Sequence, residues 1–318
     1  FLASEENDRV ITGSNYHAYV KLSEGCNQSC SFCAIPSFKG KLHSRTLESL
    51  IKEVNILVKK GYKDFSFVSQ DSSSYLRDLG HNDGLEQLID AVEKIDGVKT
   101  ARILYLYPST TTLNLIDKIA DSKVFVNYFD MPLQHISQNM LKIMKRGKGA
   151  EKLIELMNYM RSKPNSFVRT TFIAGHPGES EEDFEELCSF VEEFGFDRGN
   201  VFSYSDEEGT SAETRDDKIE QELIDERAEI LGDIISQTTI KSLENDIGKS
   251  FEVYIDGESE EHEYLLSARK TIWAPQIDGE IYINDNEDNI PIVFGEIYEV
   301  EATELAGDKL LAKIIRKV

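Results

Sequence analysis

Three of the chain's four cysteines lie within eight residues, in the stretch "KLSEGCNQSCSFCAIPSF" that covers residues 21–38. Cys26, Cys30 and Cys33 have the spacing Cys-x3-Cys-x2-Cys, which allows one loop to bring three thiolates to a common centre. A [4Fe–4S] cluster held by three cysteines keeps one iron without a protein ligand, and that iron can bind a substrate or a cofactor. Such spacing in a chain of 318 residues indicates metal or redox chemistry rather than a disulfide framework.

A structural zinc ion is the alternative for these cysteines. Zinc takes four closed ligands, and the remaining cysteine, Cys188, lies in a predicted amphipathic helix far along the chain. His43 is nearer, but it follows Cys33 by ten residues, beyond the usual ligand spacing of zinc fingers. The sequence favours an iron–sulfur cluster with an open site, and a zinc-stabilised binding module without catalysis is the alternative.

Residues 17–246 alternate between strand-like and helix-like segments. Runs rich in β-branched and aromatic residues predict strands at 17–23, 64–70, 101–108, 124–132, 167–179 (the last part a Gly/Pro turn) and 198–205. Apolar residues at helical spacing predict helices at 46–62, 84–97, 113–122, 137–146, 150–163, 180–196 and about 216–246. Six strand–helix units predict an α/β fold, an open partial (βα)6 barrel with its active groups at the C-terminal ends of the strands.

The pattern changes at Gly248. From there to Val318, short β segments separated by Gly, Asn and Asp predict a small all-β barrel of the oligonucleotide-fold type. We therefore expect two domains, a partial barrel at 1–247 and a small substrate-recognition barrel at 248–318. From Lys249 onwards there are 16 Asp and Glu against 7 Lys and Arg, a difference of −9.

The charge and hydropathy of the sequence indicate which kinds of molecule the protein can bind. The chain has a formal net charge of −23, so its surface repels nucleic-acid phosphates and attracts basic proteins. No apolar run reaches the length of a membrane helix, and no basic-then-apolar leader is present. We expect a cytoplasmic protein without a membrane partner. The chain opens with Phe1 rather than Met, which is compatible with a missing N-terminal part.

The cysteine motif, placed after the first predicted strand, resembles that of the radical S-adenosylmethionine (SAM) enzymes. The segments "YVKLSEGCNQSCSFCAIPSFKGK", "FSFVSQDSSSY", "YFDMPLQHIS" and "RTTFIAGHPGESEEDFEEL" are similar, in this order, to the methylthiotransferases of that family. The segment "SARKTIWAPQIDGEIYI" (267–283) resembles the branch that modifies an aspartate β-carbon in the twelfth protein of the small ribosomal subunit. An acidic barrel of the TRAM type agrees with a basic protein substrate, and a tRNA-adenosine methylthiotransferase is the alternative.

The resemblance implies the cofactors and their ligands. Cys26, Cys30 and Cys33 would hold the [4Fe–4S] cluster, whose open iron binds SAM. An external electron donor would reduce the cluster, and SAM would be cleaved to methionine and a 5′-deoxyadenosyl radical. The residues implied in SAM binding are Phe32, Gln70, Asp71, Arg169 and Gly175. Each also has a purely structural reading, as a core aromatic, a turn residue or a member of an ion pair.

Other residues near the predicted strand ends are further candidates, each with a structural alternative. They are Tyr105, Tyr107, Gln134, His135, Thr171, Pro177, Gly178 and Tyr204. His176 replaces the Phe that the family usually has in "GFPGE", and it is either a hydrogen-bonding group near the cofactor or a packing variant. Trp273 is either an exposed contact for the substrate protein or a core residue.

The family also has an N-terminal domain, in which three further cysteines hold a second [4Fe–4S] cluster. Besides its motif, this chain has only Cys188. We therefore expect that this domain is missing here, and that the chain binds and cleaves SAM but does not insert sulfur.

Overall fold

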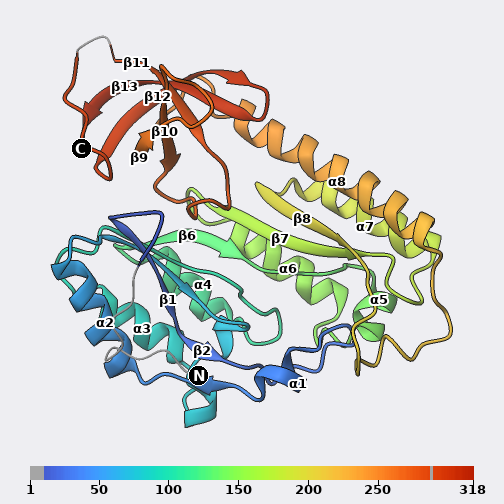
Figure 1. The fold of residues 1–318 in the computed structure, drawn as a ribbon. Helices are drawn as coiled ribbons and strands as arrows, with labels where there is room; N and C mark the ends of the chain where they lie inside the picture. The colour runs from blue at the N-terminus through green and yellow to red at the C-terminus, as the bar shows by residue number, and fades with distance from the viewer. Residues whose placement is uncertain (1–10, 287–288) are drawn as a thin grey trace.

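The computed structural model describes residues 11–286 and 289–318. Figure 1 shows an open, curved sheet with helices along its outer side and a small β-barrel at one end of it. The long helix α8 (Gln221–Glu244) runs along the sheet and leads the chain to the barrel. Within the described residues, no helix is long and apolar enough to cross a membrane.

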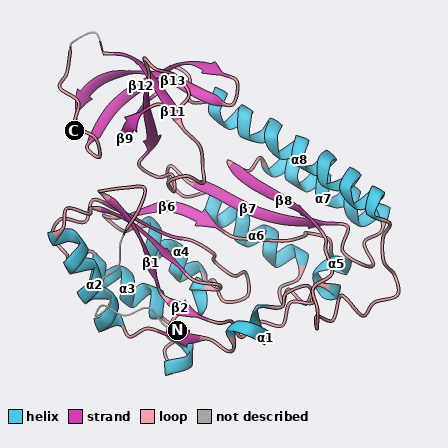
Figure 2. Cartoon of the chain, in the orientation of Figure 1, coloured by secondary structure: helices cyan, strands magenta, loops and turns pink. Residues whose placement is uncertain are grey.

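The large sheet has six parallel strands in the order β1-β4-β5-β6-β7-β8, as the sequence predicted. These strands are β1 (His17–Lys21), β4 (Asp64–Val68), β5 (Thr100–Ile103), β6 (Phe125–Asp130), β7 (Phe167–Ala174) and β8 (Arg198–Ser203). The helices before α8 are α1 (Ile35–Lys39), α2 (Leu47–Lys59), α3 (Gly84–Val92), α4 (Leu113–Ala120), α5 (Gln138–Ile143), α6 (Ala150–Arg161) and α7 (Glu181–Phe194). Figure 2 shows the helices and strands of this partial barrel alternating along the chain.

Several short elements were not predicted, because they are too short to show a period in the sequence. They are the paired strands β2 (Ser23–Glu24) and β3 (His43–Ser44) and the 3-10 turns η1 (Ser72–Ser74) and η2 (Arg77–Leu79). Helix starts were easier to predict, because capping side chains mark them. The helix predicted at 180–196 begins with the Ser-x-x-Asp pattern of a capping box, and Ser180 and Asp183 form this box at the start of α7.

The two faces of the sheet differ in chemistry, because successive side chains of a strand point to opposite sides. Outward-facing Val20 and Phe67 are buried against the helices. The inward face is polar: Ser66 Oγ lies 2.9 Å from His17 Nε2, and Arg102 Nη1 donates to Ser66 Oγ (3.0 Å). The helices cover only the outer face, so the inner face remains for the small barrel at one end and for the candidate site at the other.

The C-terminal part is a closed five-stranded barrel in the order β10-β11-β13-β12-β9, which confirms the predicted all-β barrel. Its strands are β9 (Ser250–Glu258), β10 (Leu266–Lys270), β11 (Ile281–Asp285), β12 (Ile297–Ala306) and β13 (Lys309–Lys317). Val253, Ile283 and Val300 are among the residues of its core. Helix α8 ends at Glu244, so the chain passes from one part to the other between Glu244 and Ser250.

Buried ion pairs join the barrel to the N-terminal ends of the sheet strands. Arg269 Nη2 donates to Asp64 Oδ2 (2.6 Å), and Arg102 Nη2 donates to Asp64 Oδ1 (2.8 Å). All three side chains are buried. Tyr254 and Thr100 add a hydrogen bond between their hydroxyls at 2.9 Å. The barrel therefore closes the N-terminal end of the sheet, whereas the cysteine loop lies beyond the other end of β1 (Figure 1).

Trp273 lies inside this contact. It is 1% exposed, its ring centre is 6.4 Å from that of Phe167, and Arg198 Cζ lies 5.3 Å from its ring centre. The alternative of an exposed contact for the substrate protein is therefore wrong, and the core alternative is confirmed.

Candidate functional site

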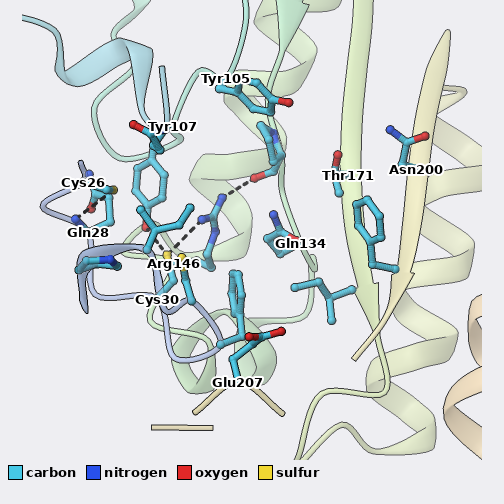
Figure 3. Close-up of a pocket in the computed structure, with 18 of the residues that line it drawn as sticks. Cys26, Gln28, Cys30, Tyr105, Tyr107, Gln134, Arg146, Thr171, Asn200 and Glu207 are labelled. Carbon is cyan, nitrogen blue, oxygen red and sulfur yellow. Dashed lines mark hydrogen bonds between the residues drawn. The ribbon is translucent and has the colours of Figure 1, made fainter. Parts of the chain in front are cut away.

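A cavity of about 810 Å³ lies on the inner face of the sheet, toward the C-terminal ends of its strands. Figure 3 shows the cysteine loop on one side of it and Thr171 of β7 and Asn200 of β8 on the other. Of the eight residues implied in cluster or SAM binding, six line this cavity together: Cys26, Cys30, Phe32, Cys33, Gln70 and Arg169. Five of the further candidates line it as well: Tyr105, Tyr107, Gln134, Thr171 and Tyr204. Residues from both ends of the sheet, more than 100 positions apart in sequence, therefore meet at one site.

A tight turn fixes the base of the cysteine loop. Gly25 has a φ of +74°, and a Cβ at this position would lie 2.2 Å from Lys41 O, so no other residue fits without displacing the backbone. Next to it, Cys26 N donates to Gly40 O (3.1 Å). This closure joins the two ends of the loop and turns the three cysteines toward the cavity.

Cys30 has two side-chain partners. Arg146 Nη1 lies 3.3 Å from Cys30 Sγ, and the Tyr107 hydroxyl lies 3.5 Å from the same sulfur. Figure 3 shows these three side chains in contact, with Arg146 stacked beside the Tyr107 ring. The guanidinium and the hydroxyl can therefore both hydrogen-bond to this sulfur.

Burial shifts the pKa of the other two cysteines. It raises the pKa of the Cys26 thiol to about 11 and also raises the pKa of Cys33. Without a metal both thiols are therefore protonated at neutral pH, and loading of a cluster releases protons. The backbone N–H of Gln28, 3.4 Å from Cys26 Sγ, partly offsets the effect of burial.

The three motif cysteines are the candidate ligands of a metal centre. Among residues 11–286 and 289–318, no group of three or more His, Cys, Asp and Glu side chains is already arranged to hold one metal ion. A structural zinc site takes four protein ligands, and the described residues that line the cavity include no fourth cysteine and no histidine. A [4Fe–4S] cluster binds each cysteine to a different iron, so three thiols on one cavity lining fit a cluster with one open iron.

His176 fastens the cysteine loop to the turn after β7. Its Nε2 lies 2.9 Å from Ser31 Oγ, and its Nδ1 lies 2.9 Å from Pro177 O. Because a carbonyl only accepts, Nδ1 carries the proton and Nε2 accepts from the Ser31 hydroxyl. Burial lowers the pKa of His176, which keeps the ring neutral. Its ring also contacts Phe32 edge-on, with 6.3 Å between ring centres.

Gln70 and Gln134 place hydrogen-bond acceptors in the cavity wall. Both Oε1 atoms are buried and have no hydrogen-bond partner among the described residues. A buried acceptor without a partner costs about 1–3 kcal/mol, so a ligand that donates to either atom would recover this cost. The amino group of SAM is such a donor, so this part of the cavity fits the predicted cofactor.

Asp71 lies behind the wall rather than on it. Its carboxylate accepts from Gln28 Nε2 (2.8 Å), Ser74 Oγ (2.6 Å) and Ser74 N (3.1 Å). Asp71 is 1% exposed and is absent from the cavity lining. The structure thus places it as the link between the cysteine loop and η1, and a direct contact with SAM remains a prediction.

Arg169 lines the cavity, but acids and an amide engage its donors. Nη1 donates to Asp130 Oδ1 (2.9 Å), Nε lies 3.6 Å from Asp278 of the small barrel, and Asn200 accepts from Nη2 (2.8 Å) when its amide oxygen faces the guanidinium. Burial raises the pKa of Asp278 to about 6. The sequence left two roles open for Arg169, binding of SAM and membership of an ion pair. The structure places it in an ion-pair network, in which the neighbouring acids balance its charge.

The turn after β7 is packed against α8 instead of facing the cavity. Gly175 has a φ of +79°, and a Cβ there would lie 2.5 Å from an Ile224 side-chain carbon. Its N–H donates to Glu179, which also contacts buried His135 (3.5 Å) and Arg227 (2.8 Å). Neither Gly175 nor His135 lines the cavity, so their roles at the cofactor remain predictions.

The mouth of the cavity carries exposed aromatic side chains. Tyr105 at the end of β5 is 39% exposed, and Phe202 on β8 is 58% exposed. Tyr105 and Gln134 also have φ values of +60° and +71°, which non-glycine residues rarely adopt. Strain of this kind is concentrated at functional sites, because the surrounding structure must hold it in place.

Comparisons with known proteins agree with this site. Residues 20–191 match the radical SAM superfamily, and residues 247–315 match the TRAM domain. The ribosomal protein uS12 methylthiotransferase RimO of Aliarcobacter butzleri (strain RM4018) is 80% identical over 318 residues, which are 99% of this chain and 71% of that protein. The chain belongs to the uS12 methylthiotransferase family.

Other members and one solved structure extend the comparison. The uS12 methylthiotransferase RimO of Sulfurovum sp. (strain NBC37-1) is 62% identical over 317 residues, covering 100% of this chain and 72% of that protein. The radical SAM enzyme coproporphyrinogen III oxidase (HemN) of Escherichia coli aligns with a TM-score of 0.56 at 16% identity, covering 74% of this chain and 57% of that one. The latter likeness supports the fold alone.

Several residues of the site could not be identified from the sequence. Arg146 contacts Cys30. Ser31 belongs to the cysteine loop and contacts His176. Asn200 accepts a hydrogen bond from Arg169. Arg146 is the last residue of the helix predicted at 137–146 and has no short motif of its own, so only the folded chain shows its contact with Cys30. Ser31 had one usable signal, since it lies between two motif residues.

Proposed function

We propose that this chain is the radical SAM and TRAM part of an enzyme that methylthiolates the β-carbon of an aspartate in ribosomal protein uS12. The observation that carries the proposal is that Cys26, Cys30 and Cys33 line one cavity together with Gln70 and Gln134, whose Oε1 atoms have no hydrogen-bond partner among the described residues. The membership of the family supports the choice of substrate.

Each part of the cavity then has a task. Cys26, Cys30 and Cys33 would hold the cluster, and Gln70 and Gln134 would accept hydrogen bonds from the amino group of SAM. Cluster and SAM together, when bound, would supply the radical chemistry that removes a hydrogen from the target carbon. The lining is largely apolar, and a substrate protein seated over the exposed mouth would complete the exclusion of water that protects a radical from side reactions.

The sulfur that is transferred needs a further source. Besides the motif cysteines, the 318 residues contain one further cysteine, Cys188. It is half-buried on α7, and burial raises the pKa of its thiol to about 11. We propose that a second cluster, on cysteines outside these 318 residues, supplies the sulfur, and that a second SAM supplies its methyl group. An external low-potential donor would supply the electrons.

Charge supports a protein substrate over tRNA. The chain carries −23 overall, and the segment from Lys249 onwards carries 16 acidic against 7 basic residues. A barrel that binds tRNA gains affinity by neutralising phosphates with cations, and this barrel lacks such an excess. A basic ribosomal protein is attracted by the same surface.

Anaerobic reconstitution with iron and sulfide tests the proposal. We expect about four irons per chain and an EPR signal of the reduced protein that changes when SAM is added. Cys26→Ala should lose both properties, whereas Cys188→Ala should keep them, because Cys188 lies on α7, away from the cavity. Uptake of zinc without iron, or an iron signal blind to SAM, would refute it.

The substrate is tested separately. Binding of the chain to uS12 and to tRNA would be compared across a salt series, at equal protein concentrations. We expect measurable affinity for uS12 that weakens with salt, and none for tRNA. The reverse order would favour the tRNA-modifying alternative.

A further inference from the structure

Arg146 points its guanidinium at one of the three cysteines (Figure 3). Nη1 donates to Cys30 Sγ (3.3 Å), Nη2 donates to Pro132 O, and Cζ lies 4.4 Å from the centre of the Tyr107 ring. The side chain is 4% exposed. A sulfur, a carbonyl and an aromatic ring therefore fix the plane of the guanidinium, and the fold itself sets the direction of the N–H toward sulfur.

The end of α5 explains how an arginine reaches this place. Lys145 has a φ of +57°, and Arg146 N donates to Leu141 O (2.9 Å), as in the Schellman motif that reverses the chain after a helix. Next to this turn, Met144 O accepts from Ser31 N of the cysteine loop (3.1 Å). One turn thus holds both the guanidinium and the backbone that carries Cys30.

The other cations of the cavity wall are engaged elsewhere. Lys21 is paired with Glu24, and Arg169 is paired with Asp130. Cys26 accepts from a backbone N–H, that of Gln28. Among the described residues that line the cavity, Arg146 is therefore the cation that contacts a motif cysteine.

We propose that Arg146 raises the reduction potential of the cluster by donating an N–H···S hydrogen bond to its Cys30 ligand. Reduction adds one negative charge to the cluster, and a buried cation beside a ligand sulfur stabilises that charge. The chain has a net charge of −23, and the electric field of that charge disfavours the addition of an electron. A cation beside the cluster opposes this effect. This inference rests on the proposed function, since it requires a cluster on the three cysteines.

The test is an EPR-monitored redox titration of the reconstituted chain. Arg146→Met removes the charge and the donor, and Arg146→Lys keeps the charge but not the planar fork. Lys142→Met is the matched control, because it removes an exposed charge from the same helix. We expect Arg146→Met to lower the reduced-to-oxidised ratio at a fixed potential about tenfold or more, which is about 59 mV for one electron.

The other variants sharpen the result. Arg146→Lys should give a smaller shift in the same direction, and so should Tyr107→Phe, which removes the longer contact to Cys30. Lys142→Met should match the wild type, because solvent and salt screen an exposed charge. Exchangeable-proton couplings of the reduced cluster, measured by ENDOR after transfer to D2O, should include a donor that Arg146→Met removes.

Two outcomes would overturn the inference. One is a wild-type potential in Arg146→Met with a full complement of iron, and the other is an equal shift in Lys142→Met. If Arg146→Met binds too little iron, Arg146→Lys and Tyr107→Phe decide the matter, and wild-type potentials in both would refute the inference. Failure of the wild-type chain to take up iron would instead refute the proposed function.

Discussion

His176 Nε2 accepts a hydrogen bond from Ser31 Oγ over 2.9 Å, and so joins the turn after β7 to the residue beside Cys30. The two residues are 145 positions apart in sequence. Both are buried, and the ring has a second hydrogen bond, from Nδ1 to Pro177 O. A histidine at this position therefore makes two hydrogen bonds that the phenylalanine usual in the resembling "GFPGE" segment does not make.

His176→Phe tests this bond. At pH 8 we expect the variant to lose about 1–3 kcal/mol of unfolding free energy, because the buried Ser31 hydroxyl loses its partner. Burial lowers the pKa of His176, so below about pH 6.5 the unfolded chain binds a proton that the folded chain does not. The stability that His176 contributes is thus present above that pH and lost as the pH falls, so the difference between the two proteins should shrink toward pH 5.

Denaturant unfolding of the metal-free chain at several pH values measures this effect. His81→Gln is the control, because His81 is exposed in a loop. A constant difference between His176→Phe and the wild type from pH 8 to pH 5 would contradict the prediction.

Gln70 offers a second test, at the cofactor wall. Gln70→Ala removes an acceptor whose Oε1 is buried without a partner among the described residues. A hydrogen bond from an amino group is worth about 0.5–1.5 kcal/mol, so the Kd for SAM should rise about 2- to 10-fold. Equilibrium binding to the reconstituted chain gives the value, and Gln87→Ala on α3 is the matched control, since its amide contacts Asp83 on the outer surface. Equal affinities of Gln70→Ala and wild type would show that the acceptor serves another donor.

Asp64 is the acid between the two buried arginines Arg102 and Arg269. Burial would raise the pKa of this carboxyl, but the two guanidinium groups outweigh burial and hold its pKa well below the usual range. Asp64→Asn leaves two buried cations without their acid and should cost about 3–5 kcal/mol of unfolding free energy near pH 7. Asp90→Asn, which breaks the exposed pair with Lys118, should leave the midpoint unchanged.

The pH dependence of Asp64→Asn has a definite sign. A lowered pKa contributes stability that is present above the unfolded value near pH 4 and is lost as the pH falls through the folded value. The cost of Asp64→Asn should therefore be constant from pH 5 to pH 7 and shrink below pH 4. Thermal unfolding across that range measures it, and a cost that grows toward acid would refute the assignment.

Asp278 should behave in the opposite way. Burial raises its pKa to about 6, so the folded chain holds a proton that the unfolded chain has released. The stability that it contributes is present below about pH 4 and is lost as the pH rises to about 6. The stability of Asp278→Asn relative to wild type should rise by roughly 3 kcal/mol across that window, since each pKa unit is about 1.4 kcal/mol. A flat difference in denaturant unfolding would contradict this.

The sequence predicted the elements well because their signals are local. The six parallel strands, the helices between them and the closing barrel have period and cap signals within each segment, such as Ser180 and Asp183 at the start of α7. The cysteine motif was equally local. Short elements such as β2 and η1 gave no period, and they were found only in the structure.

The surroundings of the site were harder to predict, because they depend on which strands become neighbours. Gln70 was predicted at a strand end and does line the cavity, while Asp71, the next residue, points behind it to Gln28. Beyond the last paired residue of a strand, the alternation of side chains no longer determines which of them faces the cavity. It also does not determine which loop packs against that strand end. Arg146 depends on a helix cap and on a loop 116 positions away, which no local pattern encodes.

The buried contact between Asp64, Arg102 and Arg269 limits how the chain can be recombined. A C-terminal barrel taken from a relative would need an arginine in the place of Arg269 and an acid in the place of Asp278. Without them, buried charges at the contact between sheet and barrel would lack their partners. The barrel therefore cannot be exchanged independently of the sheet. We expect chimaeras of this family to fold only when donor and recipient share both halves of this junction.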